Sequence, residues 1–267
     1  MQINPMWKCL ASKSIFLAIL TVHITLQTAT SWSTGFGGNP QRTSQVIPTD
    51  TFPSSTISRP YEVWKKRTVG QITSSAVLNI EDSIDPLAYI TDDVGNIICF
   101  QLTSGIFSWV VSTSYTINSS PLVFEDMLYV TTSERLYAID KIQGARKYTI
   151  EARVESSPVI SVDGKVLIFG DLDGRVYGCN AENGKIIWTY KAGAAVRSSP
   201  AISGDDKTVV FGCDDKYVYA LEVTTGTFKW KTGTRSIVRS SPALSTTHVY
   251  IGAGFGDGRL YCLRMSD

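Results

Sequence analysis

Short apolar runs separated by small polar turns recur along the chain from about residue 74 onward. In one well-defined copy, the apolar run 166–170 leads through the turn Asp173-Gly174 to an alternating run at 176–180. Runs of about five residues rich in Val, Ile and Tyr, bounded by Gly and Asp, are typical of β-strands joined by tight hairpins. The pattern therefore predicts an all-β chain of short antiparallel strands.

A serine pair marks the start of each copy, followed by proline in four copies and by alanine in the first. Its second members are Ser75, Ser120, Ser157, Ser199 and Ser241, which by subtraction lie 45, 37, 42 and 42 residues apart. This period is typical of one four-stranded propeller blade. Because proline cannot donate a ladder hydrogen bond, the strand after each pair is predicted at a sheet edge that faces the central channel.

The last strand of a copy carries an aromatic residue that we expect on the outer rim, where blades pack face to face: Trp64, Trp109, Tyr148, Trp188 and Trp230. Trp64 precedes Ser75 by the same 11 residues that separate Trp109 from Ser120. Residues 61–64 are therefore predicted to be an outer strand without its three companions, while the last copy lacks only that strand. The sequence predicts about five blades, closed into a ring by pairing 61–64 with 259–263; an open arc and a truncated product are the alternatives.

The repeat resembles the pyrroloquinoline-quinone-type repeat family. The resemblance rests on residues 155–188, which carry Ser-Ser-Pro, Gly-x-x-Asp-Gly-x-Val-Tyr and Asn-Gly-Lys-x-x-Trp, and on a lead-in segment at 37–43. It covers residues 32–264 and implies a β-propeller of four-stranded antiparallel blades. The family includes dehydrogenases, sensor domains and the propeller component of the bacterial outer-membrane barrel assembly machinery, so the resemblance implies fold more firmly than function.

The N-terminus has the layout of a secretory signal, with Lys8 and Lys13 before a short apolar run at 15–26. The expected organisation is a signal peptide at 1–30, a linker or lead-in segment at 31–60, and the propeller domain at 61–267. A signal anchor that stays uncleaved is the alternative. We expect a secreted or lumenal protein, periplasmic if bacterial, with no membrane span in the mature chain.

The composition argues against several classes of function. The net charge of +1 gives no basic surface for nucleic acid. His248 is the only histidine beyond the signal; a catalytic triad could use it, but it lies in a predicted strand without a nucleophile-elbow motif. The same scarcity of histidine excludes a metal site built on clustered His and Cys. The acidic residues near Asp92, Asp171 and Asp214 fall in the same turn of their copies and are explained by turn chemistry. We expect no metal, no cofactor and no enzymatic activity.

Four cysteines follow the signal: Cys99, Cys179, Cys213 and Cys262. Since no two are adjacent, the vicinal disulfide that the family resemblance implies for its quinone-dependent dehydrogenases is not matched. We interpret the four as buried free thiols that act as small hydrophobic residues, with disulfides as the alternative in an oxidising compartment.

One polar position varies within an otherwise repeated strand, namely the residue before each serine pair: Thr73, Asn118, Glu155, Arg197 and Arg239. Because this strand should line the channel, we predict a ring at the channel mouth that binds a partner or an acidic ligand. Pairing of Glu155 with Arg197 across neighbouring blades is the alternative. Asn118 also begins a formal N-glycosylation sequon.

The leading functional interpretation is a non-catalytic secreted or lumenal scaffold for protein–protein interaction. A lumenal or extracellular sensor module is the second interpretation, and a degenerate quinoprotein dehydrogenase-like enzyme is the third.

Overall fold

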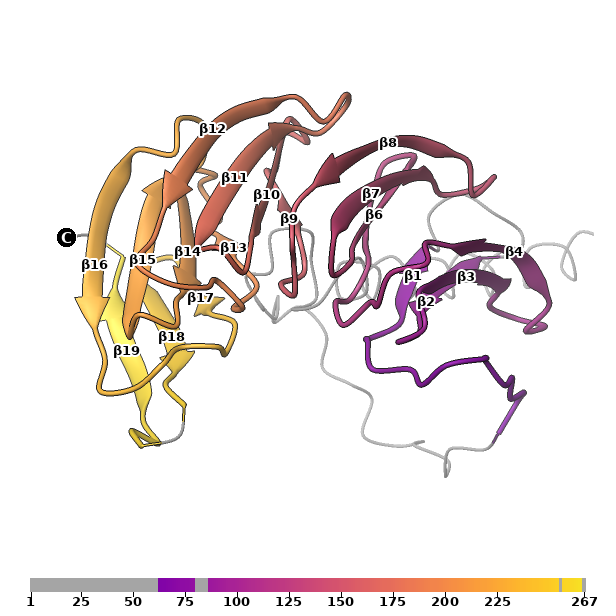
Figure 1. Ribbon diagram of the computed structural model, residues 1–267, viewed down its shortest axis with the longest axis horizontal. Helices are drawn as coiled ribbons and strands as arrows, with labels where there is room; N and C mark the ends of the chain where they lie inside the picture. The colour runs from indigo at the N-terminus through magenta and orange to yellow at the C-terminus, as the bar shows by residue number, and fades with distance from the viewer. Residues whose placement is uncertain (1–61, 80–85, 255, 266–267) are drawn as a thin grey trace, which may run out of the picture.

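The computed structural model describes residues 62–79, 86–254 and 256–265, and these residues form β-strands, turns and loops without any helix. No segment among them could cross a membrane as a helix. The expected signal peptide and the lead-in segment at 31–60 lie outside the described residues. Figure 1 shows five separate sheets that follow one another along an arc.

Four sheets have four strands and the fifth has three, and we refer to them as blades 1 to 5 in chain order. Blade 1 contains β1 (Val77–Asn79), β2 (Leu87–Thr91), β3 (Asn96–Gln101) and β4 (Phe107–Ser112). Blade 2 contains β5 (Leu122–Phe124), β6 (Met127–Thr131), β7 (Arg135–Asp140) and β8 (Arg146–Glu151).

Blade 3 contains β9 (Val159–Ile160), β10 (Val166–Gly170), β11 (Arg175–Asn180) and β12 (Ile186–Lys191). Blade 4 contains β13 (Ala201–Ile202), β14 (Thr208–Gly212), β15 (Tyr217–Glu222) and β16 (Phe228–Gly233). Blade 5 contains β17 (Ala243–Leu244), β18 (His248–Gly252) and β19 (Leu260–Arg264). The prediction of an all-β propeller-like fold built from antiparallel blades is confirmed.

The strands of a blade differ in burial from the inner to the outer edge. The second strands, such as β10 and β14, are buried at every position, which fits a strand with neighbouring blades on both sides. The outer strands β4, β8, β12 and β16 carry several exposed residues and follow the convex side of the arc in Figure 1. The short proline-preceded strands lie at the inner edge, as predicted from the serine pairs.

Each of blades 1 to 4 presents a cross-strand row of four residues to the next blade. In blade 1 the row is Val77, Tyr89, Cys99 and Trp109, which are paired directly across β1 to β4. These side chains pack against Leu128, Val130, Tyr137 and Ile139 of blade 2 in one apolar cluster. The core is therefore a series of inter-blade layers rather than one central cluster, as expected when every sheet has two faces to bury.

The serine pairs join these layers at the inner edge. The backbone N–H of Ser120 donates to the Ser157 hydroxyl at 3.0 Å, and the N–H of Ser157 donates to the Ser199 hydroxyl at 2.9 Å. The same link runs from Ser75 to Ser120 and from Ser199 to Ser241. Four consecutive hydrogen bonds thus connect all five blades near the channel.

Four of the outer-rim aromatic residues, Trp109, Tyr148, Trp188 and Trp230, lie in the outer strands of blades 1 to 4, and each packs on the next blade. The Trp109 ring covers Gly144 of blade 2, and its Nε1–H donates to the carbonyl of Lys141 at 3.3 Å. Trp188 does the same over Gly226, donating to Val223 at 2.9 Å. A Cβ at Gly144 would meet the ring at 2.7 Å, so the glycine is required by this close approach as well as by its positive φ of 69°.

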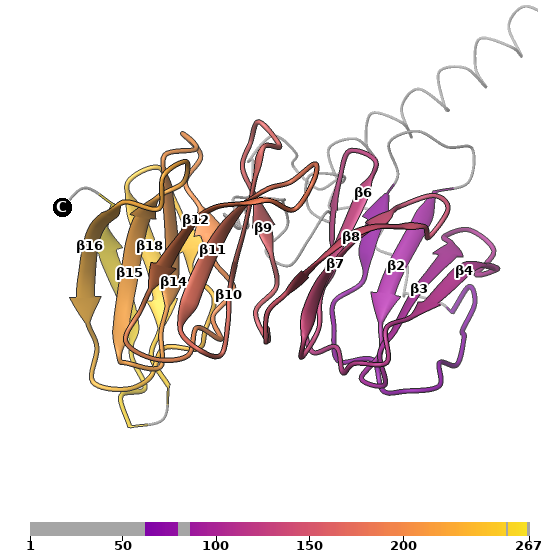
Figure 2. The same cartoon turned by 45° about the horizontal axis from the view of Figure 1, so that its top comes forward.

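The ladder expected between residues 61–64 and 259–263 is not observed. Tyr61 lies outside the described residues, and residues 62–64 form no strand. Within the described ranges β19 pairs only with β18, so blade 5 has a free edge. Trp64 instead packs against blade 1. Figures 1 and 2 show an arc whose two ends are apart.

Candidate functional site

Three of the five residues predicted at the channel mouth come together in one ionic network. Arg197, in the connection before β13, lies between Glu155 of the connection before β9 and Asp214 of the β14–β15 turn. Arg239, before β17, contacts the same Asp214 carboxylate. The channel-mouth network therefore consists of Glu155, Arg197, Asp214 and Arg239, and it spans blades 3, 4 and 5.

The geometry of the network is that of charge-assisted hydrogen bonds. Arg239 binds Asp214 in a bidentate way, with Nε and one terminal nitrogen each 2.9 Å from a carboxylate oxygen. Arg197 donates through Nε to Asp214 at 3.2 Å and through a terminal nitrogen to Glu155. Bidentate pairing of this kind fixes the planes of both groups and gives orientation as well as attraction.

The arginines are held in the charged state by these partners. A hydrogen bond from Arg197 to Glu155 raises the pKa of the guanidinium, and the bond to Asp214 raises the pKa of Arg239. Pairing of Glu155 with Arg197 is the alternative that the sequence left open, and it is the one observed. Each guanidinium still has N–H groups beyond those used in the network, since arginine carries five.

Thr73 and Asn118 are exposed at equivalent positions before β1 and β5, and no contact joins them to the four network residues. The predicted ring therefore exists as a row of equivalent positions, but only its last three members are joined. The glycosylation of Asn118 stays a prediction.

Asp214 is the network residue that sequence reasoning missed, because it was interpreted as a turn residue. The turn is in fact capped by its neighbour Asp215, whose carboxylate accepts from the N–H of Tyr217 and of Gly193. Asp214 is left free to point to the arginines. The repeat did contain a sign of this role, because the position of Asp214 varies from blade to blade. It holds Asp93 in blade 1, Leu172 in blade 3 and Gly254 in blade 5.

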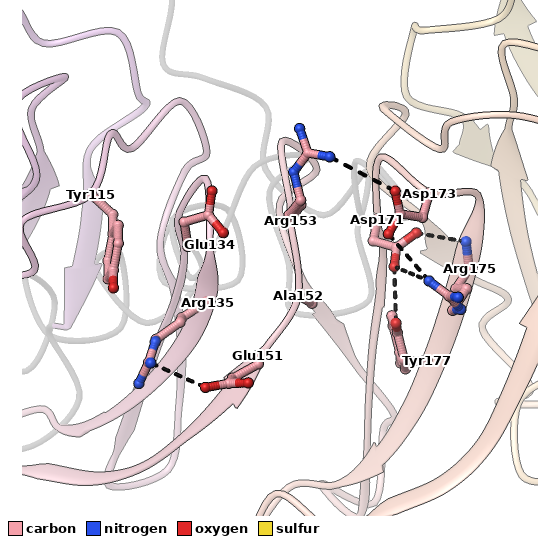
Figure 3. Close-up of a pocket in the computed structure, with 10 residues that line it drawn as sticks. All are labelled: Tyr115, Glu134, Arg135, Glu151, Ala152, Arg153, Asp171, Asp173, Arg175 and Tyr177. Carbon is pink, nitrogen blue, oxygen red and sulfur yellow. Dashed lines mark hydrogen bonds and ion pairs between the residues drawn. The ribbon is translucent and has the colours of Figure 1, made fainter.

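A polar pocket of about 360 Å³ lies between blades 2 and 3. Like the network, it is lined by residues from the connections between blades and from the turn between the second and third strands of a blade. Figure 3 shows its two sides, with Arg135 and Glu151 facing Asp171, Asp173 and Arg175. The connection from β8 to β9 joins pocket and network, because Arg153 lines the pocket and Glu155 belongs to the network.

Most charges of the pocket are paired within it. Arg135 contacts Glu151 at 3.1 Å, and Arg175 contacts Asp173 at 3.2 Å. Asp171 is buried at 1% exposure and accepts from the Arg175 backbone N–H and from the Tyr177 hydroxyl at 2.9 Å. Burial, followed by that hydrogen bond, raises the pKa of Tyr177 to about 12. Glu134 is exposed and has no ion pair among the described residues.

Conventional catalytic arrangements are scarce in the part of the chain that the structure describes. It holds no cluster of three or more His, Cys, Asp or Glu side chains suited to a metal ion. His248 contacts the hydroxyl of its neighbour Thr247 and lies beside Tyr250.

The four cysteines that the structure describes are free thiols, and three of them are buried. Burial raises the pKa of the Cys99, Cys179 and Cys213 thiols to about 12, whereas Cys262 is exposed. The expectation that all four are buried is thus wrong for Cys262, because no outer strand or further blade covers β19 among the described residues.

Comparison with known proteins supports the repeat assignment. A family model described as outer membrane protein assembly factor BamB matches residues 150–267. The crystal structure of BamB from Moraxella catarrhalis is similar over 76% of this chain and 76% of that chain, with 18% identity and a TM-score of 0.51. No curated protein matches.

A computationally designed protein, Ika8, is similar over 71% of this chain and 57% of that chain, with 15% identity and a TM-score of 0.60. At such identities the two structures establish similarity of fold alone. Together with the family match, they show a β-propeller-like fold whose repeats at residues 150–267 resemble those of the pyrroloquinoline-quinone-type BamB family.

Proposed function

We propose that this chain is a non-catalytic β-propeller scaffold that binds a protein partner at its channel mouth. One observation carries the proposal. On a framework whose serine and aromatic contacts repeat from blade to blade, the residues that vary in charge form a continuous network across three blades. Repeat proteins commonly keep framework positions alike and diversify the binding face.

A protein partner fits this surface better than a small acidic ligand. Two arginines are matched by two carboxylates in the network, so an acidic ligand would compete with Glu155 and Asp214. The side chain of Arg239 is about half exposed, and its guanidinium keeps N–H groups that could donate to a partner's backbone carbonyls. Arginine is also enriched among the residues that dominate protein–protein binding energy.

The adjoining pocket gives the partner a second contact. Its acidic side chains Glu134, Glu151, Asp171 and Asp173 outnumber Arg135, Arg153 and Arg175 by one, and Glu134 is the exposed carboxylate left over. A basic side chain of the partner would be favoured there. The N-terminal signal pattern and the similarity to an assembly factor agree with a role in the secretory pathway or the cell envelope.

The proposal is tested by affinity capture from the secretory or envelope fraction with three forms of the chain. We expect the unmodified chain to capture a discrete partner. The Arg197→Ala/Arg239→Ala variant should capture at least about ten-fold less of that partner. Arg146→Ala/Lys185→Ala is the matched control, since it removes two positive charges from the exposed outer rim. Equal capture by all three forms would contradict the proposal.

A further inference from the structure

The connection between β8 and β9 is two residues shorter than its counterparts in the later blades. In the β12–β13 connection, the N–H of Ala192 donates to the turn of its own blade, and the carbonyl of Ala195 accepts from the turn of the next blade. Ala152 and Arg153 make the same two hydrogen bonds in the β8–β9 connection, although they are adjacent in the sequence. The two residues between Ala192 and Ala195 therefore have no counterpart between blades 2 and 3.

The missing residues would carry a backbone N–H that the next blade uses. Gly193 donates its N–H to the Asp215 carboxylate of blade 4 at 3.1 Å. Arg235, at the same place in the β16–β17 connection, donates to the Asp257 carboxylate of blade 5 at 3.1 Å. Asp173 is the corresponding carboxylate of blade 3, and no N–H of the described β8–β9 connection donates to it.

Asp173 also lacks the tyrosine hydroxyl that its counterparts accept. Tyrosines of β15 and β19 donate to the corresponding carboxylates in blades 4 and 5. In blade 3 the equivalent Tyr177 donates to Asp171 at 2.9 Å instead. Within the described part of the chain, the Asp173 carboxylate contacts only two arginines, Arg175 at 3.2 Å and Arg153 at 3.9 Å. It is half exposed and has capacity for a further donor.

The pocket between blades 2 and 3 lies at the point where the connection is shortened. Ala152 and Arg153, on either side of that point, both line it, as does Asp173. Figure 3 shows Arg153 between Glu134 and Asp173, with its guanidinium directed to Asp173. The volume of about 360 Å³ is within the range of ligand sites. An occupant of this pocket would stand where the longer connections place their own backbone.

The charge of the pocket selects among such occupants. Glu134 is exposed and makes no ion pair with any described residue, whereas Glu151 is paired with Arg135 at 3.1 Å. A positive side chain near Glu134 would balance the one carboxylate of the pocket that lacks a partner. A negative side chain would compete with the carboxylates already there.

We propose that the pocket receives a short segment of the protein partner, which donates a backbone N–H to Asp173 and places a basic side chain beside Glu134. The segment supplies from outside what Gly193 supplies within the chain one blade further on. This inference rests on the proposed function for the source of the segment, and it adds the chemistry by which the pocket recognises it.

Capped tripeptides test the pocket directly, by NMR titration of the isotopically labelled full chain. The probe is acetyl-Gly-Arg-Gly-amide. Its N-methylarginine form lacks the N–H that would donate to Asp173, its norleucine form lacks the charge, and methylguanidinium offers the charge without a peptide. We expect the probe to bind with a Kd at least about ten-fold below that of each of the other three compounds, in a range up to about 10 mM because so small a peptide makes few contacts.

Insertion of Gly-Ala between Ala152 and Arg153 gives the β8–β9 connection the length of the β12–β13 connection. The inserted residues should fill the pocket and supply the missing N–H, so that the fold is kept and binding of the probe falls at least about ten-fold. The same insertion between Thr224 and Thr225, in the exposed turn between β15 and β16, is the matched control and should leave the Kd within about two-fold.

A single substitution keeps the test decisive if the insertion does not fold. Asp173→Ala should weaken binding of the probe at least about ten-fold, whereas Asp205→Ala, at an exposed turn aspartate of blade 4, should leave it unchanged. No binding of the probe, equal binding of its N-methyl form or of methylguanidinium, or full binding to Asp173→Ala would overturn the inference. Because no probe contact involves Arg197 or Arg239, failure of this titration is distinguishable from failure of capture at the channel mouth.

Discussion

At the scale of single residues, the second serine of each pair joins two blades because its hydroxyl accepts a backbone N–H from the preceding pair. Ser157 is buried at 5% exposure and accepts from Ser120, which is itself buried. A polar group in such a place is stabilising only while it is paired.

Ser157→Ala should therefore destabilise the protein by about 1–3 kcal/mol, because it leaves the buried Ser120 N–H without its acceptor. Ser112→Ala is the matched control at an exposed serine of β4 and should change the free energy of unfolding by less than about 0.5 kcal/mol. Urea unfolding of both variants measures the difference. Equal stability of the two variants would mean that the link contributes nothing.

Thiol chemistry at the residue scale follows from burial. Burial raises the pKa of Cys179 from 9.0 to about 12, so at pH 8 this residue stays a protonated, unreactive thiol. A pKa raised in the folded state stabilises the protein below the unfolded value of 9.0, and that contribution is lost as the pH rises toward 12.

We expect alkylation at pH 8 to modify Cys262 quickly and Cys99, Cys179 and Cys213 only after denaturation. Mass spectrometry of digested protein locates the modified residues, and Cys262→Ser should abolish the fast reaction among these four. Rapid labelling of Cys179 in folded protein at pH 8 would show that blade 3 is not packed as described.

At the scale of elements, blades 1 to 4 each place a small residue directly opposite their outer-strand aromatic. In blade 3 this residue is Gly178, paired directly with Trp188, and a Cβ there would meet the ring at 2.1 Å. Trp188 is 8% exposed and contacts Gly226 of blade 4 as well, so it has little space into which to move.

Gly178→Ala should lower the free energy of unfolding by about 1–3 kcal/mol through overpacking. Alanine occupies the equivalent position in blades 2 and 4. Gly233→Ala is the control, because a Cβ at Gly233 meets its nearest neighbour at 3.4 Å and the residue also lies in a strand. Thermal unfolding should show a lower Tm for the first variant and an unchanged Tm for the second. A tolerated Gly178→Ala would mean that Trp188 is loosely held.

The elements were predictable from the sequence to a large extent, because their signals are local. The serine-proline pairs placed the inner strands, and the turn glycines placed the outer ones. Asp214 was missed because a carboxylate beside a turn has two roles that sequence does not separate, capping the turn or pairing across blades. The pocket between blades 2 and 3 was also missed, since it depends on the relative placement of Arg135 and Arg175, which are 40 residues apart.

At the scale of the whole molecule, the inter-blade layers explain why the chain holds its arc. Apolar clusters lie between successive blades, and the four serine links run along the inner edge. Such an architecture distributes stability over neighbouring units and leaves the loops at the channel mouth free to vary. The predicted ring ladder was not found in the open arc, because long-range pairing is not encoded in local periodicity.

The central claim is that a protein partner binds at the channel-mouth network, and site-specific photo-crosslinking tests it most directly. A photoreactive phenylalanine analogue at Arg153, between the pocket and the network, should give one discrete crosslinked partner from the secretory or envelope fraction. The same group at Lys185 on the outer rim should give none, and Arg197→Ala/Arg239→Ala should remove the crosslink at position 153. Equal crosslinking from both positions, or a crosslink at 153 that survives the double substitution, would contradict the account.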